Sequence, residues 1–284
     1  MKILRFKDRY IECSGRPHLM GILNLTPDSF SDGGLYPNTA SAVDAALEMV
    51  ENGAAVIDIG GESTRPGARP VSLQEEIKRV VPVIKALRMS SGDIAISIDT
   101  TKPEVAASAL EAGADIINDI SGLQASPELA DIAARYNAGL ILMHMRGTPA
   151  TMKGLCRYDN LLEEICIFLR NAAGTAVSCG VPEENIVLDP GIGFAKNTEQ
   201  NIEIMQKIKK FEKLGFPLLA GPSRKTFIGD ITGKSNPARR IWGTAGAVAW
   251  LALQRVDFIR VHDVGAMYDV IEIINAVLSA DSAV

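Results

Sequence analysis

Short apolar runs that end in polar residues recur along the whole chain. The first begins at His18 and ends at Asn24, where a loop rich in Pro, Asp, Ser and Gly follows. A strand of a parallel sheet is covered on both faces, so its sequence is apolar throughout instead of alternating. The pattern predicts eight such strands, at residues 18–24, 54–60, 94–99, 115–119, 140–143, 186–189, 216–221 and 258–261.

Helical patterns fill the segments between these runs. Ser72 with Glu75, and Thr101 with Glu104, have the spacing of capping boxes at helix starts. Besides the two helices that follow these caps, we expect helices at residues 39–52, from 126, 160–178, 198–213, 225–229, from 237 and near the C-terminus. The last helix is predicted to bury one face, formed by Met267, Val270, Ile271, Ile274 and Val277.

Strands that alternate with helices predict a parallel sheet with right-handed connections. Eight such units without a linker to a second part of the chain predict an α/β fold, a single (β/α)8 TIM barrel domain over residues 1–284. Residues 2–13 alternate loosely around Lys7 and Asp8, which predicts a short N-terminal hairpin. This hairpin either plugs the bottom of the barrel or is a loosely ordered terminus.

Composition and charge narrow the class of protein. The net charge is −5, from 29 basic and 34 acidic residues without a long run of either sign. We therefore expect no nucleic-acid partner, because the phosphate backbone demands a basic surface. The N-terminus lacks the apolar core of a signal peptide, and residues 243–253, the longest apolar stretch, are too short to cross a bilayer. The four cysteines lack metal-ligand spacing and are expected to be reduced, so we predict a cytoplasmic protein without a membrane partner.

Polar residues collect at the carboxyl ends of the predicted strands, which form a single mouth if the barrel closes. Asp99, Asn118, Asp189 and Lys225 suit a flat heterocycle with several donors and acceptors. A carboxylate accepts two parallel N–H groups, an amide both donates and accepts, and an ammonium group meets a ring carbonyl. Each aspartate taken alone could equally cap the next helix, but four such residues at one rim favour a binding site.

The last strand carries two cationic candidates. Arg260 and His262 are two residues apart and therefore point the same way, next to the loop that carries Lys225. We predict an anion or phosphate clamp, because phosphate sites of barrel enzymes lie at the last two strands. The alternative is a surface arginine with a hydrogen-bonded histidine. At the first strand, the amide oxygen of Asn24 could help to hold Mg²⁺, which keeps most of its waters and needs few protein ligands.

The other histidines are weaker candidates. His18 begins its strand at the opposite rim and is predicted to be structural. His144 lies at the correct rim and is either a site residue or a hydrogen-bonded loop residue. No G-x-G-x-x-G segment follows a strand into a helix, so a dinucleotide site is not supported.

Eight segments resemble the motifs of the dihydropteroate synthases. They are MGILNLTPDSFSDGG at 20–34, DIGGESTRPGA at 58–68, SIDTTKPEVA at 97–106, IINDISG at 116–122, LMHMRGTP at 142–149, LDPGIGFAKN at 188–197, SRKTFIG at 223–229 and IRVHDV at 259–264. The resemblance covers nearly the whole chain. It implies a transferase of folate biosynthesis that condenses 6-hydroxymethyl-7,8-dihydropterin diphosphate with para-aminobenzoate, giving 7,8-dihydropteroate and diphosphate, with Mg²⁺ as cofactor and a homodimer formed through the outer helices.

The resemblance also implies a role for each site residue. Residues that would bind the pterin or its diphosphate are Thr64, Asp99, Asn118, Met143, Asp189, Lys225, Arg260 and His262. Residues that would meet the aminobenzoate are Thr64, Pro66, Phe194 and Thr226, the last replacing a serine found in many relatives. Arg65, Asp99 and Lys225 would act in catalysis, and Asn24 would bind the metal.

Two alternatives stay open. A pterin-binding methyltransferase of the same barrel type would need neither the pair Arg260 and His262 on the last strand nor the loop at 26–34. A non-catalytic pterin-binding barrel would be expected to have lost Arg65, Lys225 or that pair, and all are present. The long polar loops at 26–34 and 61–70 are predicted to close over the bound pterin diphosphate and exclude water. The chemistry is expected to proceed without a covalent enzyme intermediate, because the sequence shows no nucleophile–base pair.

Overall fold

Eight parallel strands form the centre of the protein. The computed structural model describes residues 2–26, 39–63 and 70–280. The barrel strands are β3 (His18–Asn24), β4 (Ala54–Gly60), β5 (Ala95–Asp99), β6 (Ile116–Asp119), β7 (Gly139–Met143), β8 (Ile186–Asp189), β9 (Leu219–Ala220) and β10 (Phe258–Val261). They pair in the order β8-β7-β6-β5-β4-β3-β10-β9, and a bridge between Leu188 and Leu218 joins the two ends of this order. The predicted (β/α)8 barrel is confirmed.

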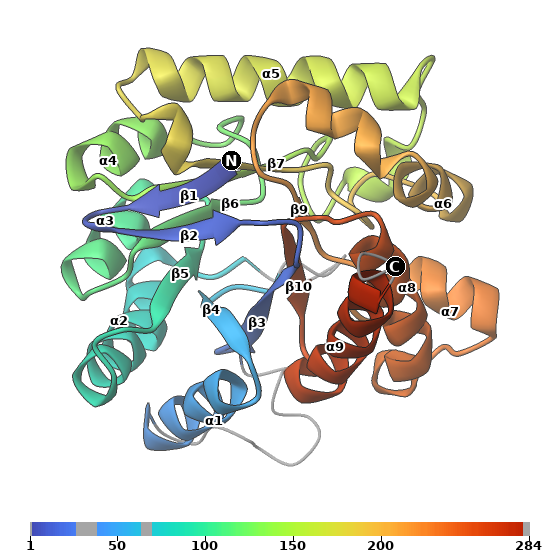
Figure 1. The fold of residues 1–284 in the computed structure, drawn as a ribbon. Helices are drawn as coiled ribbons and strands as arrows, with labels where there is room; N and C mark the ends of the chain where they lie inside the picture. The colour runs from blue at the N-terminus through green and yellow to red at the C-terminus, as the bar shows by residue number, and fades with distance from the viewer. Residues whose placement is uncertain (1, 27–38, 64–69, 281–284) are drawn as a thin grey trace.

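Helices surround the strands on the outside (Figure 1). They are α1 (Thr39–Glu51), α2 (Leu73–Ser90), α3 (Pro103–Glu111), α4 (Glu128–Tyr136), α5 (Leu161–Ser178), α6 (Thr198–Gln206), α7 (Thr226–Thr232), α8 (Ile241–Leu253) and α9 (Val264–Ala280). Short 3₁₀ turns are η2 (Met152–Gly154), η3 (Glu183–Asn185), η4 (Ile208–Leu214) and η5 (Pro237–Arg240). No helix among residues 2–26, 39–63 and 70–280 is long and apolar enough to span a membrane.

Two predicted elements differ in length from the observed ones. The helix expected at 198–213 ends after Gln206, and a 3₁₀ turn replaces its second half. That turn places residues three apart on one side, so that Ile208 and Phe211 are both buried in the core. The strand expected at 216–221 is only two residues long, since Pro217 has no N–H to donate to a neighbouring strand.

Helix caps and the last helix also bring corrections. Ser72 caps α2 by accepting the backbone N–H of Glu75, which is one half of the predicted capping box, whereas the Glu75 side chain accepts from Arg79. The capping box predicted at Thr101 and Glu104 is wrong, because α3 follows Lys102 without a side-chain cap. On α9, Met267 and Ile271 are buried, but Val277 is 61% exposed. The buried face predicted for α9 is therefore wrong in its last turns, which extend beyond the core.

The N-terminal hairpin closes the bottom of the barrel. It consists of β1 (Lys2–Phe6) and β2 (Arg9–Cys13), paired antiparallel. Leu4 and Phe6 belong to the same buried cluster as the lowest inward-facing layer of the strands, formed by Met20, Val56, Ala95, Ile116, Ile141, Val187, Leu219 and Phe258. The first of the two alternatives for this hairpin, a plug, is the observed one. His18 is structural as predicted, with its Nε2 atom 2.8 Å from the carbonyl oxygen of Glu12.

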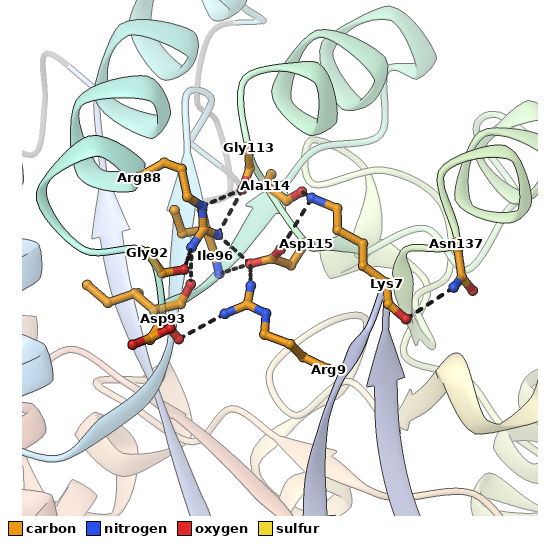
Figure 2. A network of polar contacts seen from close by, with 11 residues as sticks. Lys7, Arg9, Arg88, Gly92, Asp93, Ile96, Gly113, Ala114, Asp115 and Asn137 are labelled. Atoms are coloured by element: carbon orange, nitrogen blue, oxygen red, sulfur yellow. Dashed lines mark hydrogen bonds and ion pairs between the residues drawn. The ribbon is translucent and has the colours of Figure 1, made fainter.

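One buried carboxylate ties the hairpin to the barrel (Figure 2). Asp115 lies 2.6 Å from Arg88 and 2.8 Å from Arg9 through its Oδ2 atom, and 3.3 Å from Lys7 through its Oδ1 atom. The Oδ2 atom also accepts the backbone N–H of Ile96 at 3.0 Å. We call these five residues the Asp115 network. It joins the hairpin, helix α2 and strand β5 through a single acidic side chain.

Candidate active site

A cavity of about 270 Å³ lies at the carboxyl ends of the barrel strands. Every predicted site residue within the described ranges lines it; they are Asn24, Asp99, Asn118, Met143, Asp189, Phe194, Lys225, Thr226, Arg260 and His262. Residues far apart in the sequence therefore meet at one small-molecule-sized site. Thr64, Arg65 and Pro66 lie outside the described residues, as do most of the two loops predicted to close over the cavity, so these predictions stand as they were.

Strand register explains why the polar side chains meet. Asp99 is the last residue of β5, and its register partner on the next strand is Asn118. Met143 ends β7 and is paired in register with Asp189, the last residue of β8. Residues in register on neighbouring parallel strands point to the same side, which here is the interior of the barrel mouth. The barrel thus places two carboxylates and an amide around one opening.

Arg260 is held by two carboxylates. Its Nε atom lies 2.6 Å from the Oδ2 atom of Asp58, and its Nη2 atom lies 2.7 Å from the Oδ2 atom of Asp99. The side chain faces the cavity as predicted, but its positive charge is already paired with two carboxylates of the protein. The sequence analysis missed Asp58, although an aspartate inside the apolar run AAVIDIG of β4 is a usable signal.

Burial brings three titratable groups of the site towards neutral pH. It raises the pKa of Asp99, and the repulsion from Asp58 and Glu76 adds to this effect while Arg260 and Lys225 oppose it. Burial also raises the pKa of Asp189 to about 6, against the backbone N–H of Gly191 and the nearby cations. Burial and the charge of Arg260 lower the pKa of Lys225 to about 8. Such values allow these groups to change charge near neutral pH.

Lys225 links the pterin and aminobenzoate candidates. Its Nζ atom lies 3.9 Å from the centre of the Phe194 ring, within cation–π distance. Lys225 is also the residue that precedes α7, so that Thr226 is the first residue of this helix, as the sequence suggested. The hydroxyl and backbone N–H of Thr226 therefore lie at the same cavity wall as the ammonium group of Lys225.

His144 and Lys196 hold the loop that follows β8. The Nζ atom of Lys196 is 3.0 Å from the Nδ1 atom of His144 and donates to the carbonyl oxygens of Gly191 and Phe194 at 2.9 and 2.8 Å. Burial lowers the pKa of Lys196 to about 7 and lowers the pKa of His144 far below its usual range. His144 is thus the hydrogen-bonded loop residue of the two alternatives. Gly191, at φ +74°, is required there because a Cβ atom would lie 2.0 Å from the carbonyl oxygen of His144.

The second cationic candidate, His262, is oriented by a neighbouring hydroxyl. Its Nδ1 atom lies 2.9 Å from the Oγ atom of Ser223, which also accepts the backbone N–H of His262 at 3.2 Å. A hydroxyl that already accepts this N–H can donate to a neutral imidazole, which leaves the proton on Nε2. His262 would then present a donor, the group that an anionic oxygen needs.

The donor set at the mouth fits Mg²⁺ only together with a substrate. Asn24 offers a neutral amide oxygen, which is a hard ligand of the kind Mg²⁺ prefers. No group of three or more His, Cys, Asp or Glu residues within the described ranges could hold a metal ion by itself. The remaining ligands would have to be phosphate oxygens and water, which is the usual arrangement for Mg²⁺ bound with a phosphorylated substrate.

Known proteins of the same fold and sequence pattern define the family. The pterin binding enzyme model matches residues 20–262. The dihydropteroate synthase of Synechocystis is 50% identical over 261 residues, which cover 92% of this chain and 90% of that protein. Two structures of the Xanthomonas albilineans dihydropteroate synthase superpose with TM-scores of 0.89 and 0.86. The complex with 4-aminobenzoic acid is 40% identical and covers 97% of this chain and 98% of that one. The complex with 7,8-dihydropteroate is 37% identical, again with 97% and 98% covered. The chain therefore belongs to the pterin-binding enzyme family, among its dihydropteroate synthases.

Proposed function

We propose that this chain condenses 6-hydroxymethyl-7,8-dihydropterin diphosphate with para-aminobenzoate to give 7,8-dihydropteroate and diphosphate. The observation that carries the proposal is the joint placement of two carboxylates, an amide, a lysine and an arginine–histidine pair around one cavity. The relatives solved with 4-aminobenzoic acid and with 7,8-dihydropteroate support it, since the two ligands are a substrate and the product of this reaction.

The pterin ring would be recognised by the polar groups at the strand ends. Asp189 uses its Oδ1 atom to accept the backbone N–H of Gly191 at 2.7 Å, which leaves capacity on its carboxylate for the ring's amino and N–H groups. Asn118 would supply an acceptor, Lys225 would meet the ring carbonyl, and Met143 would pack against the ring. Asp99, whose pKa burial raises further than that of Asp189, would lie near the carbon at which the bonds change.

The reaction breaks one bond and forms another at the exocyclic carbon of the pterin. The C–O bond breaks with its electron pair leaving on the diphosphate, to which Arg260 would supply a positive charge and His262 an N–H donor. Mg²⁺, held by Asn24 and the phosphate oxygens, would supply further charge neutralisation. The carbon then carries positive charge, which spreads into the pterin ring and is favoured by the carboxylate of Asp99.

The aminobenzoate nitrogen completes the reaction. An aromatic amine is uncharged at neutral pH, so its lone pair can form the C–N bond without a strong base, and the surplus proton passes to water. Phe194 and Thr226, with Thr64 and Pro66 from the second loop, would hold this substrate. A pterin–protein adduct found in a rapid-quench digest would contradict this scheme, which forms no covalent enzyme intermediate.

The test is diphosphate release from the pterin diphosphate by the purified chain. We expect release that requires both para-aminobenzoate and Mg²⁺ and that is matched by formation of dihydropteroate. Methyl transfer to a cobalamin protein without diphosphate release would favour the methyltransferase alternative. Tight binding of the pterin diphosphate without turnover would favour the non-catalytic barrel.

The oligomeric state and location belong to the same proposal. Helices α7, α8 and α9 lie together on one side of the barrel (Figure 1), and Ile231, Trp242 and Ile273 on them are 59%, 77% and 67% exposed. Large apolar side chains at such exposure favour an interface, so we expect a homodimer through these helices. Sedimentation of the wild-type chain as a monomer would contradict it. The four cysteines are free, as a cytoplasmic location requires.

A further inference from the structure

Asp58 is a buried charge that no step of the reaction uses. It lies in the middle of β4, in register with Ile22 on β3 and Ser97 on β5, and is fully buried. A residue without exposed surface cannot touch a ligand in the cavity. Burying an ionised carboxylate also costs several kcal/mol unless its partners compensate, so its presence in a barrel core needs a reason.

The contacts of Asp58 reach both sides of the site. Its Oδ2 atom accepts the Nε–H of Arg260 at 2.6 Å and the Nδ2–H of Asn118 at 3.1 Å. Arg260 is on β10 and Asn118 is on β6, and each of these strands is two places away from β4 in the barrel. One oxygen atom therefore joins two side chains that both line the cavity, across five consecutive strands.

These contacts fix which groups face the ligand. Because the Nδ2 atom of Asn118 donates to Asp58, its amide oxygen is the end left to accept an N–H from a bound ring. Because Arg260 is held at Nε by Asp58 and at Nη2 by Asp99, its planar guanidinium group is fixed in orientation as well as in place. The Oδ1 atom of Asp58 has no hydrogen-bond partner among the described residues. The carboxylate is thus placed for these two side chains and not for a saturated structural network.

We propose that Asp58 is a positioning residue that aligns Asn118 and Arg260 for the pterin diphosphate. The inference rests on the proposed function and extends it by one residue that touches neither substrate. It predicts that Asp58 and Asn118 work as a pair, with the charge on one and the N–H donor on the other. Their contributions to substrate binding should therefore depend on each other.

The experiment uses the full chain and four variants. Asp58→Asn keeps the shape but removes the charge, and Asn118→Asp sets two carboxylates against each other. In the exchange variant, Asp58→Asn with Asn118→Asp, the repulsion between two carboxylates is absent, and an amide N–H at the Oδ2 position can donate to the introduced carboxylate, although the Nε–H of Arg260 then loses its acceptor there. The matched control is Ser97→Ala, at the register position beside Asp58, because the Oγ atom of Ser97 is buried and has no hydrogen-bond partner among the described residues.

The readouts are the dissociation constant for the pterin diphosphate, kcat, KM and the melting temperature. We expect Asp58→Asn to weaken binding about tenfold to a hundredfold, and Asn118→Asp to weaken it at least as much. The exchange variant should lose at least tenfold less affinity than the product of the two single losses, because positions 58 and 118 are in contact, and Ser97→Ala should match wild type within about twofold. Such coupling in substrate binding is not expected of a residue that only stabilises the fold.

Three results would overturn the proposal. The first is wild-type affinity in Asp58→Asn, the second is an exchange variant whose loss of affinity equals the product of the two single losses, and the third is loss of folding in every variant at position 58. The wild-type chain is assayed for diphosphate release in the same series. Absence of turnover there would count against the proposed function, whereas turnover together with one of the three results would count against Asp58 alone.

Discussion

Both ends of the barrel bury aspartate side chains, but the partners that compensate for their charge differ. At the bottom, Asp115 accepts from Arg88 and from the backbone N–H of Ile96 and forms ion pairs with Lys7 and Arg9, so that cations outnumber carboxylates and both of its oxygens are used. Figure 2 shows these partners converging from the hairpin and the barrel on one side chain. Such a network is complete within the protein and stabilises one arrangement of the chain.

The mouth has no such excess of cations. Three buried carboxylates, those of Asp58, Asp99 and Asp189, share the charges of Arg260, Lys225 and Lys196. One oxygen of Asp58 lacks a partner in the described chain, and burial raises the pKa of Asp99 and Asp189. Polar groups left partly unsatisfied cost stability, and a ligand that pairs with them recovers it. Whether the protein itself supplies every partner of a buried polar group, and not its burial or charge, therefore separates the structural cluster from the binding site.

Replacing Asp115 should lower the stability of the protein more than the other changes, because it breaks the Asp115 network. Asp115→Ala leaves three cations and the backbone N–H of Ile96 without their common acceptor. We expect the free energy of unfolding to fall by about 3–5 kcal/mol, as for other buried pairs that lose one partner. Urea denaturation followed by circular dichroism measures it. A loss below about 1 kcal/mol would show that the cations find other acceptors and that the network is not structural.

The same kind of change at the mouth should separate binding from stability. Asp189→Asn removes an acceptor for the pterin, and we expect affinity for the pterin diphosphate to fall about a hundredfold by calorimetry. The pKa of Asp189 is raised from 3.8 to about 6, so its contribution to stability is present at low pH and is lost as pH rises through 6. At pH 7 its ionised form opposes folding, and the variant should be about 1–3 kcal/mol more stable. Lower stability in the variant would show that the mouth is a structural cluster as well.

The sequence predicts the mouth better than it predicts the contacts beneath it. Asp99, Asn118 and Asp189 each follow an apolar run, and the ends of parallel strands meet at one rim, so one-dimensional order is enough to bring them together. Asp58 interrupts a run instead of ending it, and its partners on β6 and β10 are set by barrel closure. The sequence therefore assigns Arg260 to an anion without its two carboxylate partners, because the order of residues signals Asp58 and Asp99 but not their contact with Arg260.

Loops and short elements also depended on three-dimensional context. Lys196 lies in a polar loop motif that resembles a surface segment, and it becomes buried only because the loop folds back over His144. The strand before Lys225 is short because Pro217 lacks an N–H, and the helix after β8 changes to a 3₁₀ turn to bury Phe211. Periodicity identified these elements, but packing decided their lengths.

The pH dependence of catalysis tests the charge balance of the mouth directly. Asp189, with a pKa of about 6, must be ionised to accept two N–H groups, and Lys225, with a pKa of about 8, must be protonated to donate. Asp99, whose pKa burial raises to about 7, must also be ionised to favour the positive charge on the pterin. We expect kcat/KM for the pterin diphosphate to fall below about pH 7, more steeply once Asp189 is also protonated, and above about pH 8, where the loss approaches tenfold per pH unit. Lys225→Arg should remove the alkaline limb, because arginine stays charged. Substrate ionisation affects both proteins equally, so an alkaline limb that persists in the variant would exclude Lys225 as its source.

Replacing Arg9 should have the smallest effect, because it removes only one of several partners of Asp115. Arg9 forms an ion pair with Asp115 at 2.8 Å and donates to the carbonyl oxygen of Asp93 at 2.9 Å, and its side chain is 34% exposed. In Arg9→Ala the carboxylate of Asp115 keeps Arg88, Lys7 and one backbone N–H, so the free energy of unfolding should fall by only about 0.5–1 kcal/mol. Urea denaturation gives this value, and kcat/KM should stay within about twofold of wild type because the hairpin lies at the opposite end from the cavity. A loss as large as that of Asp115→Ala would mean that the network depends on every member. The partners of Asp115 would then not be redundant, and both ends of the barrel would be equally sensitive to the loss of one charge.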